Sequence, residues 1–387
     1  MDAGTGDRRR RAIHVGLNLV YLVPGETGGM ETYARELIPA LVEARPDLRL
    51  TAFVNRETYG AAGPWTDLIE CVRVPVSARR RTGWVRGEQQ YVPRLAARAG
   101  VDVLHSLGST APAWSRFRRV TTIHDLIYRI YPEAHSALRS RGMAVLVPLA
   151  ARRSHRVIAP SRTTRDDLVR LLSVPPDKID VIPEGVGSPP DEATPEAELR
   201  RQLDIGDRRV VLAASAKRAH KNLLCLLDAW ALLAPERRPV LVLPGYPTDH
   251  ERELRAHAVR LGLESDARFI GWVSSADLEG LYRLASCFVF PSLYEGFGLP
   301  VLEAMARGLP VACSDRGALG EVAGDAARIF DPEQPRSIAD AVEALLEDAA
   351  LAARLRAAGL EQAGRFTWSE TARATLGSYD AALESAP

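Results

Sequence analysis

The chain has 387 residues, of which 46% are hydrophobic, 26% are charged and 6% are aromatic. This length allows two or three domains with cores of their own, and the composition excludes a disordered chain, a collagen and a coiled coil. The 50 basic and 49 acidic residues leave a formal net charge of +1, so no overall field favours nucleic acid or an anionic membrane. Any anion site must therefore be local, and we expect no nucleic-acid partner.

The cysteines and lysines are few and informative. Cys71, Cys225, Cys287 and Cys313 form neither a C-x-x-C pair nor a cluster with histidine, so we expect no structural zinc and no disulfide framework. Free thiols are typical of a reducing compartment, and we predict a cytoplasmic location. Among the basic residues, only those at 178, 217 and 221 are lysines.

The N-terminal region resembles a secretory signal, because arginines at 8–11 precede a largely apolar stretch. His14 and Asn18 interrupt that stretch and a glycine loop follows at 25–29, so a buried first strand is the better interpretation. No segment reaches the roughly 18 continuous apolar residues that a membrane span needs. We therefore predict no transmembrane segment, and peripheral contact with a membrane stays open.

Short apolar runs alternate with helix-period segments along the chain, which predicts a repeated order of strand and helix. The runs are continuous rather than alternating, as in strands that helices cover on both faces, so we predict parallel sheets. The predicted fold class is therefore α/β, with two doubly wound, Rossmann-like domains. The predicted strands lie at 13–20, 50–54, 101–105, 120–123 and 157–159, and then at 210–214, 240–243, 268–270, 287–290, 310–313 and 328–330.

A proline-rich, acidic stretch at 187–195 separates the two series of strands. We predict an N-terminal Rossmann-like domain over 1–186, a second one over 187–365 and a C-terminal helical segment over 366–387. In open parallel sheets, ligands bind beyond the carboxyl ends of the strands, and two such domains offer the cleft between them as the default site. The candidate residues are therefore those on loops that follow strands.

The segment 290–308 runs from a predicted strand through a glycine loop into a helix, with Glu295 in the loop and Glu303 in the early helix. Gly296 and Gly298 let backbone N–H groups approach a ligand, and a helix N-terminus attracts phosphate. Carboxylates repel phosphate but accept hydrogen bonds from sugar and ribose hydroxyls. We therefore predict that the backbone amides bind phosphate and that both glutamates bind hydroxyl groups of the ligand. The plainer alternative is that both glutamates merely favour a helix N-terminus.

The segment 214–223 also follows a predicted strand and opens a helix. It holds two of the three lysines, Lys217 and Lys221, with Arg218 between them. Cations at a helix N-terminus oppose the helix macrodipole, so they cost stability unless an anion binds there. A compact ammonium suits a diphosphate and an arginine adds a forked contact, which predicts a diphosphate site. A solvated helix start is the alternative.

Three loops of the first half add weaker signals. Gly28 and Gly29 follow the first strand without the spacing of a dinucleotide or phosphate loop, which disfavours a dinucleotide oxidoreductase. Adjacent glycines instead let the backbone approach a substrate. His124 and Asp125 end a predicted strand, so His124 should point into the cleft. Ser161 is expected to be a helix cap first and a ligand contact second.

Several catalytic motifs do not occur in the sequence. We find no D-x-D pair for a nucleotide-bound metal, no H-E-x-x-H and no G-x-S-x-G. Serine hydrolases and zinc proteases are therefore disfavoured, and we expect no metal in the site.

Six segments occur in an order that resembles the retaining glycosyltransferases of family 4, also called glycosyl transferases group 1, which have the GT-B fold. The resemblance covers nearly the whole chain, and its E-x7-E motif is the most specific part. Phe366-Thr-Trp-Ser369 also resembles the start of the terminal helix that, in this family, crosses back onto the N-terminal domain. The six segments are Gly28-Gly-Met-Glu-Thr-Tyr33, His124-Asp125, Ala159-Pro-Ser161, Val181-Ile-Pro-Glu-Gly185, Lys217-Arg-Ala-His-Lys-Asn222 and Glu295-Gly-Phe-Gly-Leu-Pro-Val-Leu-Glu303.

The resemblance implies transfer of a hexose from a nucleotide sugar, with the N-terminal domain on the acceptor side and no cofactor beyond that co-substrate. His124, Lys221 and Glu295 would then be catalytic, and Gly28, Gly29, Asp125 and Ser161 would line the acceptor side or the junction. The implied donor site comprises Gly29, Lys217, Arg218, Lys221, Glu295, Gly296, Phe297, Gly298, Leu299 and Glu303.

One position departs from the family. An arginine often stands five residues before the motif lysine, and this chain has Ala216 there, so Lys217 or Arg218 must supply the second charge. Two alternatives to a transferase stay open: a sugar-nucleotide epimerase or hydrolase of the same fold, and a catalytically silent protein that binds sugar nucleotides.

Overall fold

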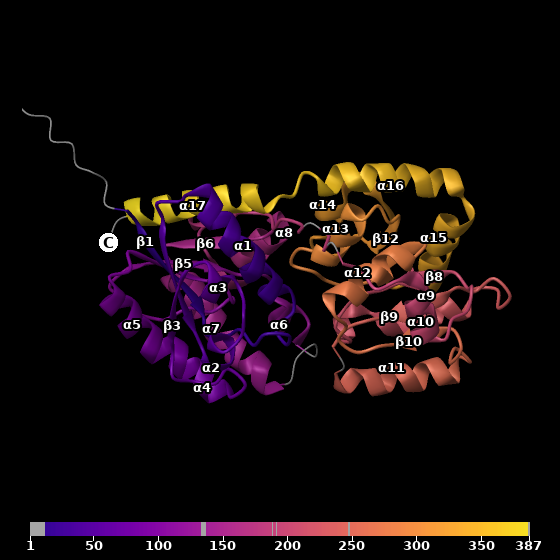
Figure 1. The fold of residues 1–387 in the computed structure, drawn as a ribbon, viewed down its shortest axis with the longest axis horizontal. Coiled ribbons are helices and arrows are strands. Elements are labelled where there is room, and N and C mark those ends of the chain that lie inside the picture. Colours follow the sequence, from indigo (N-terminus) through magenta and orange to yellow (C-terminus); the bar gives the residue numbers. More distant parts are fainter. Residues whose placement is uncertain (1–11, 133–136, 188, 191, 247, 386–387) are drawn as a thin grey trace, which may run out of the picture. The chain divides into compact units, whose positions relative to one another are not determined.

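The computed structural model describes residues 12–132, 137–187, 189–190, 192–246 and 248–385 (Figure 1). By its contacts the chain divides into two compact units. Unit 1 comprises Met1–Ile123, Leu146–Ile158 and Ala372–Pro387, and unit 2 comprises His124–Val145 and Ala159–Thr371. Strands and helices alternate and build two sheets, which confirms the predicted α/β class with Rossmann-like sheets.

The first sheet has the strand order β3-β2-β1-β4-β5-β6-β7. The pairings from β3 through to β6 are all parallel, and the strands β1, β4 and β6 are buried along nearly their whole length. The order reverses between β1 and β4, where the crevice of a doubly wound sheet lies. The strands are β1 His14–Leu19, β2 Arg49–Val54, β3 Glu70–Arg73, β4 Val103–Ser106, β5 Arg118–Thr122, β6 Arg156–Ala159 and β7 Ile179–Val181.

The second sheet repeats this plan with the order β10-β9-β8-β11-β12-β13, and it is parallel throughout. Its order reverses between β8 and β11, so its crevice lies between the loops that follow these two strands. The strands are β8 Val210–Leu212, β9 Val240–Leu243, β10 Ala267–Phe269, β11 Cys287–Phe290, β12 Val311–Ser314 and β13 Ala327–Phe330.

Helices cover both faces of the second sheet, as its continuous apolar strands predict. Val210 and Leu212 pack with α9, α12, α13 and α14, whereas their neighbour Val211 packs on the other face with α10, α11 and α15. These helices are α9 Glu196–Leu203, α10 Leu223–Ala231, α11 Asp249–Arg260, α12 Ser275–Leu284, α13 Leu299–Ala306, α14 Leu319–Ala323 and α15 Pro335–Glu347, followed by α16 Ala349–Ala363 and α17 Trp368–Glu384.

The helices of the first half are shorter on average and include one π-helical turn. Ser161 caps α8 by accepting a hydrogen bond from the Thr164 N–H at 3.0 Å, as predicted for a serine at this position. The elements are α1 Gly29–Ala44, α2 Arg56–Tyr59, α3 Pro64–Asp67, α4 Arg81–Arg86, the π turn η1 Gly87–Tyr91, α5 Val92–Ala99, α6 Ile127–Ile130, α7 Ala137–Arg153 and α8 Arg162–Leu172. Short 3₁₀ turns in the described parts of the chain include η3 Pro176–Lys178, and, in the second half, η4 Ala219–Lys221 and η5 Gly324–Ala326.

The last helix, α17, contributes to unit 1 from Ala372 onward, that is, with all but its first turn. Tyr379 forms a hydrogen bond of 2.8 Å with Nδ1 of His105, and Asp380 pairs with Arg45 at 3.1 Å. Residues from Ala372 onward therefore belong to unit 1. The predicted domain limits at 186 and 365 stay predictions, because units defined by contacts do not follow the chain order. None of the helices in the described ranges has both the length and the apolarity needed to cross a bilayer.

Every predicted strand has a counterpart, and in the described ranges β3 and β7 are the strands that were not predicted. β3 is a half-exposed strand at the sheet edge with Glu70 and Arg73 at its ends, so its sequence lacks a continuous apolar run. β7 has only 3 residues, Ile179–Val181. Neither strand contains an apolar run that is long enough to be recognised in the sequence.

Candidate functional site

The loops after β8 and β11 bring two charged groups of the predicted site together. Nζ of Lys221 lies 2.5 Å from Oε1 of Glu295, and the two side chains are only 15% and 11% exposed. The ammonium also lies 5.2 Å from the centre of the Phe290 ring, at the end of β11. A lysine and a glutamate that are 74 positions apart are thus paired at the switch point of the second sheet.

Arg218 provides a second cation at this place. Burial lowers the pKa of its guanidinium, whereas the nearby carboxylates of Asp125 and Glu295 raise it. Arg218 therefore lies within electrostatic range of Glu295, the partner of Lys221. The cluster holds positive charge on two residues whose ends differ in shape, a compact ammonium and a planar fork.

The glycine loop between β11 and α13 is packed so tightly that larger residues do not fit. A Cβ atom on Gly296 would lie 1.9 Å from the carbonyl oxygen of His124, and one on Gly317 would lie 2.5 Å from that of Glu295. Gly298 has φ 118 at the N-cap of α13 and offers no side chain to the first turn of that helix. The backbone N–H groups of this first turn therefore lack a side-chain cap.

The N-terminus of α8 holds the same loop from another side. The Ser161 hydroxyl donates to the carbonyl of Gly296 at 2.7 Å, and that of Thr164 donates to it at 3.1 Å and to the His124 carbonyl at 3.3 Å. Ser161 is thus a cap and also a support of the loop. Within unit 2, the fold brings His124, Ser161 and Gly296 together from three distant segments.

His124 has a buried carboxylate as its partner. Its Nδ1 lies 2.9 Å from Oε1 of Glu184, and the side chains are 12% and 7% exposed. Asp125, the next residue, accepts a hydrogen bond from the Ile127 N–H at 2.9 Å. A carboxylate that is bonded to one ring nitrogen fixes the orientation of the imidazole.

Lys217 does not join this cluster. Its side chain is fully buried, and its ammonium donates to the carbonyls of Gly245 at 2.8 Å and Ile270 at 2.7 Å, with Glu251 at 3.7 Å. Burial lowers the pKa of Lys217, and the charge of Glu251 opposes that shift. The Lys217 ammonium is therefore engaged away from Lys221, which leaves Arg218 as the candidate for the second cation.

The other predicted residues occupy separate places. Oε2 of Glu303, on α13, accepts a hydrogen bond from the Tyr282 hydroxyl at 3.1 Å. Phe297 packs edge-on against Phe366 at 5.9 Å, and Leu299 is buried in the core beneath the loop. Gly28 and Gly29 start α1 in unit 1, where a Cβ on either would meet no atom within 4 Å.

Three residues at this site were not predicted. Glu184 lies three residues after Val181, the last residue of β7, and the available signal was its place in the segment Val181–Gly185 that carries the family resemblance. Asp167 accepts a hydrogen bond of 2.5 Å from the hydroxyl of Tyr294, the residue before Glu295. The pairing of Asp167 with Tyr294 joins α8 to the loop after β11, and nothing in the local sequence indicates it.

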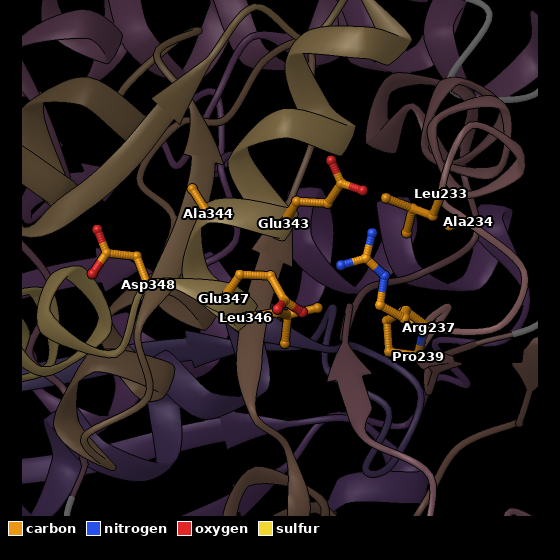
Figure 2. A pocket seen from close by; sticks show the side chains of 9 residues that line it. All are labelled: Leu233, Ala234, Arg237, Pro239, Glu343, Ala344, Leu346, Glu347 and Asp348. Carbon is orange, nitrogen blue, oxygen red and sulfur yellow. The ribbon is translucent and has the colours of Figure 1, made fainter.

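Two surface cavities of unit 2, of about 430 and 520 Å³, lie elsewhere. Figure 2 shows the first, where Glu343 and Glu347 of α15 surround a space next to Arg237. Neither cavity contains a predicted site residue; apolar and charged residues line the first, and mostly charged residues line the second. The candidate functional site is therefore the cluster of Lys221, Glu295 and Arg218 and not either of these cavities. In the described part of the chain, no group of three or more His, Cys, Asp or Glu residues is arranged to hold a metal ion.

Two Rossmann-like units with parallel sheets define the GT-B class of folds. Among solved structures, HepE from Anabaena in complex with UDP and glucose is similar, with a TM-score of 0.74 and 21% identity over 95% of this chain and 99% of that one. The family model for glycosyl transferases group 1 matches residues 195–362, and the model for glycosyltransferase family 4 matches residues 27–187.

Two relatives extend this likeness in sequence. The O-antigen chain mannosyltransferase B of Escherichia coli is 33% identical over 68% of this chain and 70% of its own length. A D-inositol 3-phosphate glycosyltransferase of Xylanimonas cellulosilytica is 34% identical over 94% of both chains. The chain therefore belongs to the group 1 glycosyltransferases, and it is an enzyme that transfers a glycosyl group from a sugar donor.

Proposed function

We propose that the enzyme transfers a hexose from a nucleoside diphosphate sugar to an acceptor hydroxyl, with retention of anomeric configuration and without a metal ion. The observation that carries this proposal is the pairing of Lys221 with Glu295, beside Arg218, at the switch point of the second sheet. Cations that are held next to carboxylates suit a ligand with phosphate and hydroxyl groups side by side.

The reaction needs a group that stabilises negative charge on the leaving diphosphate. When the bond from the anomeric carbon to the phosphate oxygen breaks, the electron pair stays on that oxygen, next to Lys221 and Arg218. The acceptor oxygen forms the new bond on the same face of the sugar, and its proton passes to the departing phosphate. The amides of residues 296–299 and the N-terminus of α13 add positive potential there.

The remaining residues take roles by their position. Glu295, which its neighbours Gly296 and Gly317 hold tightly, accepts hydrogen bonds from the hexose hydroxyls. Glu303 binds the ribose hydroxyls, and His124, with Glu184 on its other side, contacts the hexose. Gly28, Gly29, Asp125 and Ser161 serve the acceptor side or the junction between donor and acceptor.

The relatives in sequence and the similar solved structure of HepE narrow the choice of sugar donors to test. A mannosyltransferase, an inositol-phosphate glycosyltransferase and a complex with UDP and glucose make UDP- and GDP-hexoses the first donors to test. We place the reaction in the cytoplasm. Peripheral contact with a membrane or an anionic acceptor would involve the exposed arginines at 79–81 and 86 in unit 1.

A thermal-shift panel of UDP, GDP, ADP and dTDP tests the donor site. A ligand at a hundred times its Kd stabilises the folded state by about 2.7 kcal/mol, so the matching nucleotide should raise the melting temperature by several degrees. At the same concentration, this nucleotide should raise the melting temperature of Lys221→Ala by less than half as much, whereas the control Lys178→Ala should respond like the wild type. No response to any of the four nucleotides would overturn the proposal.

Turnover then tests the chemistry. With the matching hexose donor, Lys221→Ala should lower kcat about 10²- to 10³-fold, as the loss of a preorganised electrostatic group does. Activity should survive excess EDTA, and the anomeric coupling of the product in proton NMR should equal that of the donor. Inversion of the product, or loss of activity on chelation, would contradict the corresponding part of the proposal.

A further inference from the structure

The first sheet has a switch point of its own, between β1 and β4. The loops that follow these strands are residues 20–28 and 107–113, which we call loop A and loop B. Tyr21 of loop A packs against Gly108 of loop B so closely that a Cβ there would lie 2.4 Å from its ring. By the general rule for doubly wound sheets, a ligand of unit 1 belongs at these loops.

A carboxyl group is buried beneath both loops. Glu88 is only 1% exposed and lies in the π turn η1, a rare element that is frequent at functional sites. The π turn approaches the start of loop A closely here, because a Cβ on Gly87 would lie 2.8 Å from Val20. The π turn thereby places the Glu88 carboxylate at the end of β1.

Each oxygen of this carboxylate accepts hydrogen bonds from groups that lead to a loop. Oε1 accepts from the Asn18 amide at 3.2 Å and from the Thr110 hydroxyl of loop B at 2.8 Å, and Oε2 accepts from the Gln89 amide at 3.1 Å. Asn18 in turn accepts from the Val20 N–H, the first of loop A, at 3.3 Å.

Gln89 extends the same support along loop B. Its amide donates to the Ala111 carbonyl at 3.0 Å, and its oxygen accepts from the Ala113 N–H at 2.9 Å. Ser109 has φ 65, in the left-handed region that a residue with a side chain rarely adopts. Loop B is therefore held in a conformation that it would not choose by itself.

The charge of Glu88 has no compensation in the described part of unit 1. No ion pair with a lysine, arginine or histidine is formed there, and burial raises the pKa of Glu88 to about 7 while the three hydrogen bonds oppose that shift. A buried carboxyl group without a cation costs stability. An apolar residue at this position would stabilise the fold more, so the presence of a carboxyl group here indicates a role other than packing.

We propose that Glu88 is a positioning residue, which aligns loops A and B so that unit 1 binds the acceptor. The inference rests on the proposed function, since it needs an acceptor. Glu88 itself touches no substrate, because its side chain is enclosed by Asn18, Gln89 and Thr110. Its influence therefore reaches the acceptor through the loops and leaves the donor site in unit 2 alone.

The variant Glu88→Gln separates this role from packing. Glutamine has the same shape, but one acceptor oxygen becomes a donor that faces the donors of Asn18, Thr110 or Gln89. The double variant Asn18→Asp/Glu88→Gln restores a matched pair with the carboxylate on the other residue. Glu36→Gln is the matched control, because burial also raises the pKa of Glu36 on α1 but this residue lies outside both loops.

The kinetic test uses UDP-glucose and GDP-mannose as donors and methyl α-D-mannopyranoside as the acceptor probe. In Glu88→Gln the acceptor KM should rise about tenfold, which corresponds to the loss of one net hydrogen bond. The donor KM and donor hydrolysis without acceptor should stay within about twofold of the wild type. The double variant should recover most of the acceptor KM. An unchanged acceptor KM, or equal changes in both KM values, would overturn the inference.

Hydrogen exchange gives a readout that does not depend on activity. Peptides that cover loops A and B should exchange faster in Glu88→Gln than in the wild type and Glu36→Gln, whereas peptides of unit 2 should exchange as in the wild type. If the wild-type enzyme transferred to no acceptor with any donor, the proposed function would fail, and the exchange in loops A and B would still decide the role of Glu88. Unchanged exchange in both loops would refute that role.

Discussion

Replacing Lys217 by methionine separates the two lysines that the sequence places four residues apart. Methionine fills a similar volume but leaves the carbonyls of Gly245 and Ile270 without their donor and Glu251 without its nearby cation. Each unsatisfied buried group costs about 1–3 kcal/mol, and removing one partner of a buried charge pair costs about 3–5 kcal/mol. We expect unfolding to become easier by about 3–5 kcal/mol.

Thermal unfolding followed by circular dichroism measures this loss. A decrease of that size lowers the melting temperature of a unit with about 200 residues by about 10 °C. Lys217→Arg should also destabilise, because a planar guanidinium does not fit acceptors that surround a compact ammonium. Lys221→Met should lose turnover, and its melting temperature should also fall, because it leaves the mostly buried Glu295 without its cation. A stable but inactive Lys217→Met would refute this reasoning, because it would place the Lys217 ammonium at the donor.

Three further predictions concern other buried groups. Glu184→Gln keeps a hydrogen-bond partner for His124 but removes its negative charge, so kcat should fall about 10- to 100-fold while the melting temperature stays the same; a wild-type kcat would exclude an electrostatic role of Glu184. Gly296→Ala should lose activity and about 1–3 kcal/mol of stability, since the new Cβ would lie 1.9 Å from the His124 carbonyl, whereas Gly377→Ala, which meets no atom within 4 Å, should do neither. Burial raises the pKa of Glu88 from 4.5 to about 7, so the folded state holds this proton more tightly than the unfolded state. Its contribution to the free energy of unfolding is complete below about pH 4.5 and is lost as the pH rises through about 7, a decline of about 3 kcal/mol. Glu88→Gln should remove this decline, as urea unfolding at pH 5 and pH 8 would measure. The same difference in unfolding free energy between the two pH values in wild type and Glu88→Gln would contradict the prediction.

The fold follows from the sequence because its signal is local and repeated. A buried parallel strand is a continuous apolar run, and such runs locate β1, β9 and β11 within one or two residues. The signal disappears where burial does, as in the half-exposed edge strand β3. Register and strand order, in contrast, depend on contacts over long sequence distances that no apolar run contains.

The sequence predicts which loops carry the site, but it does not predict the direction in which each side chain points. Glycines and charges after a strand indicate Lys221 and Glu295, because the carboxyl end of a strand is a local feature. Apart from the family resemblance, nothing in the local sequence shows which of Lys217 and Lys221 faces the site, since the short 3₁₀ turn Ala219–Lys221, capped by Asn222 with φ 57, follows no regular period. Glu88 is missed for a similar reason: the π turn η1 shifts it inward from where a 3.6-residue period would place it.

The central claim is that Lys221 holds the diphosphate of the donor. Calorimetric titration of UDP and of uridine, or of GDP and guanosine if guanine is the preferred base, tests it most directly in the wild type, Lys221→Ala and Lys178→Ala. We predict that Lys221→Ala weakens the diphosphate about 10- to 100-fold and leaves the nucleoside unchanged, because only the former meets the ammonium. An equal loss for both ligands, or no loss for the diphosphate, would contradict the account.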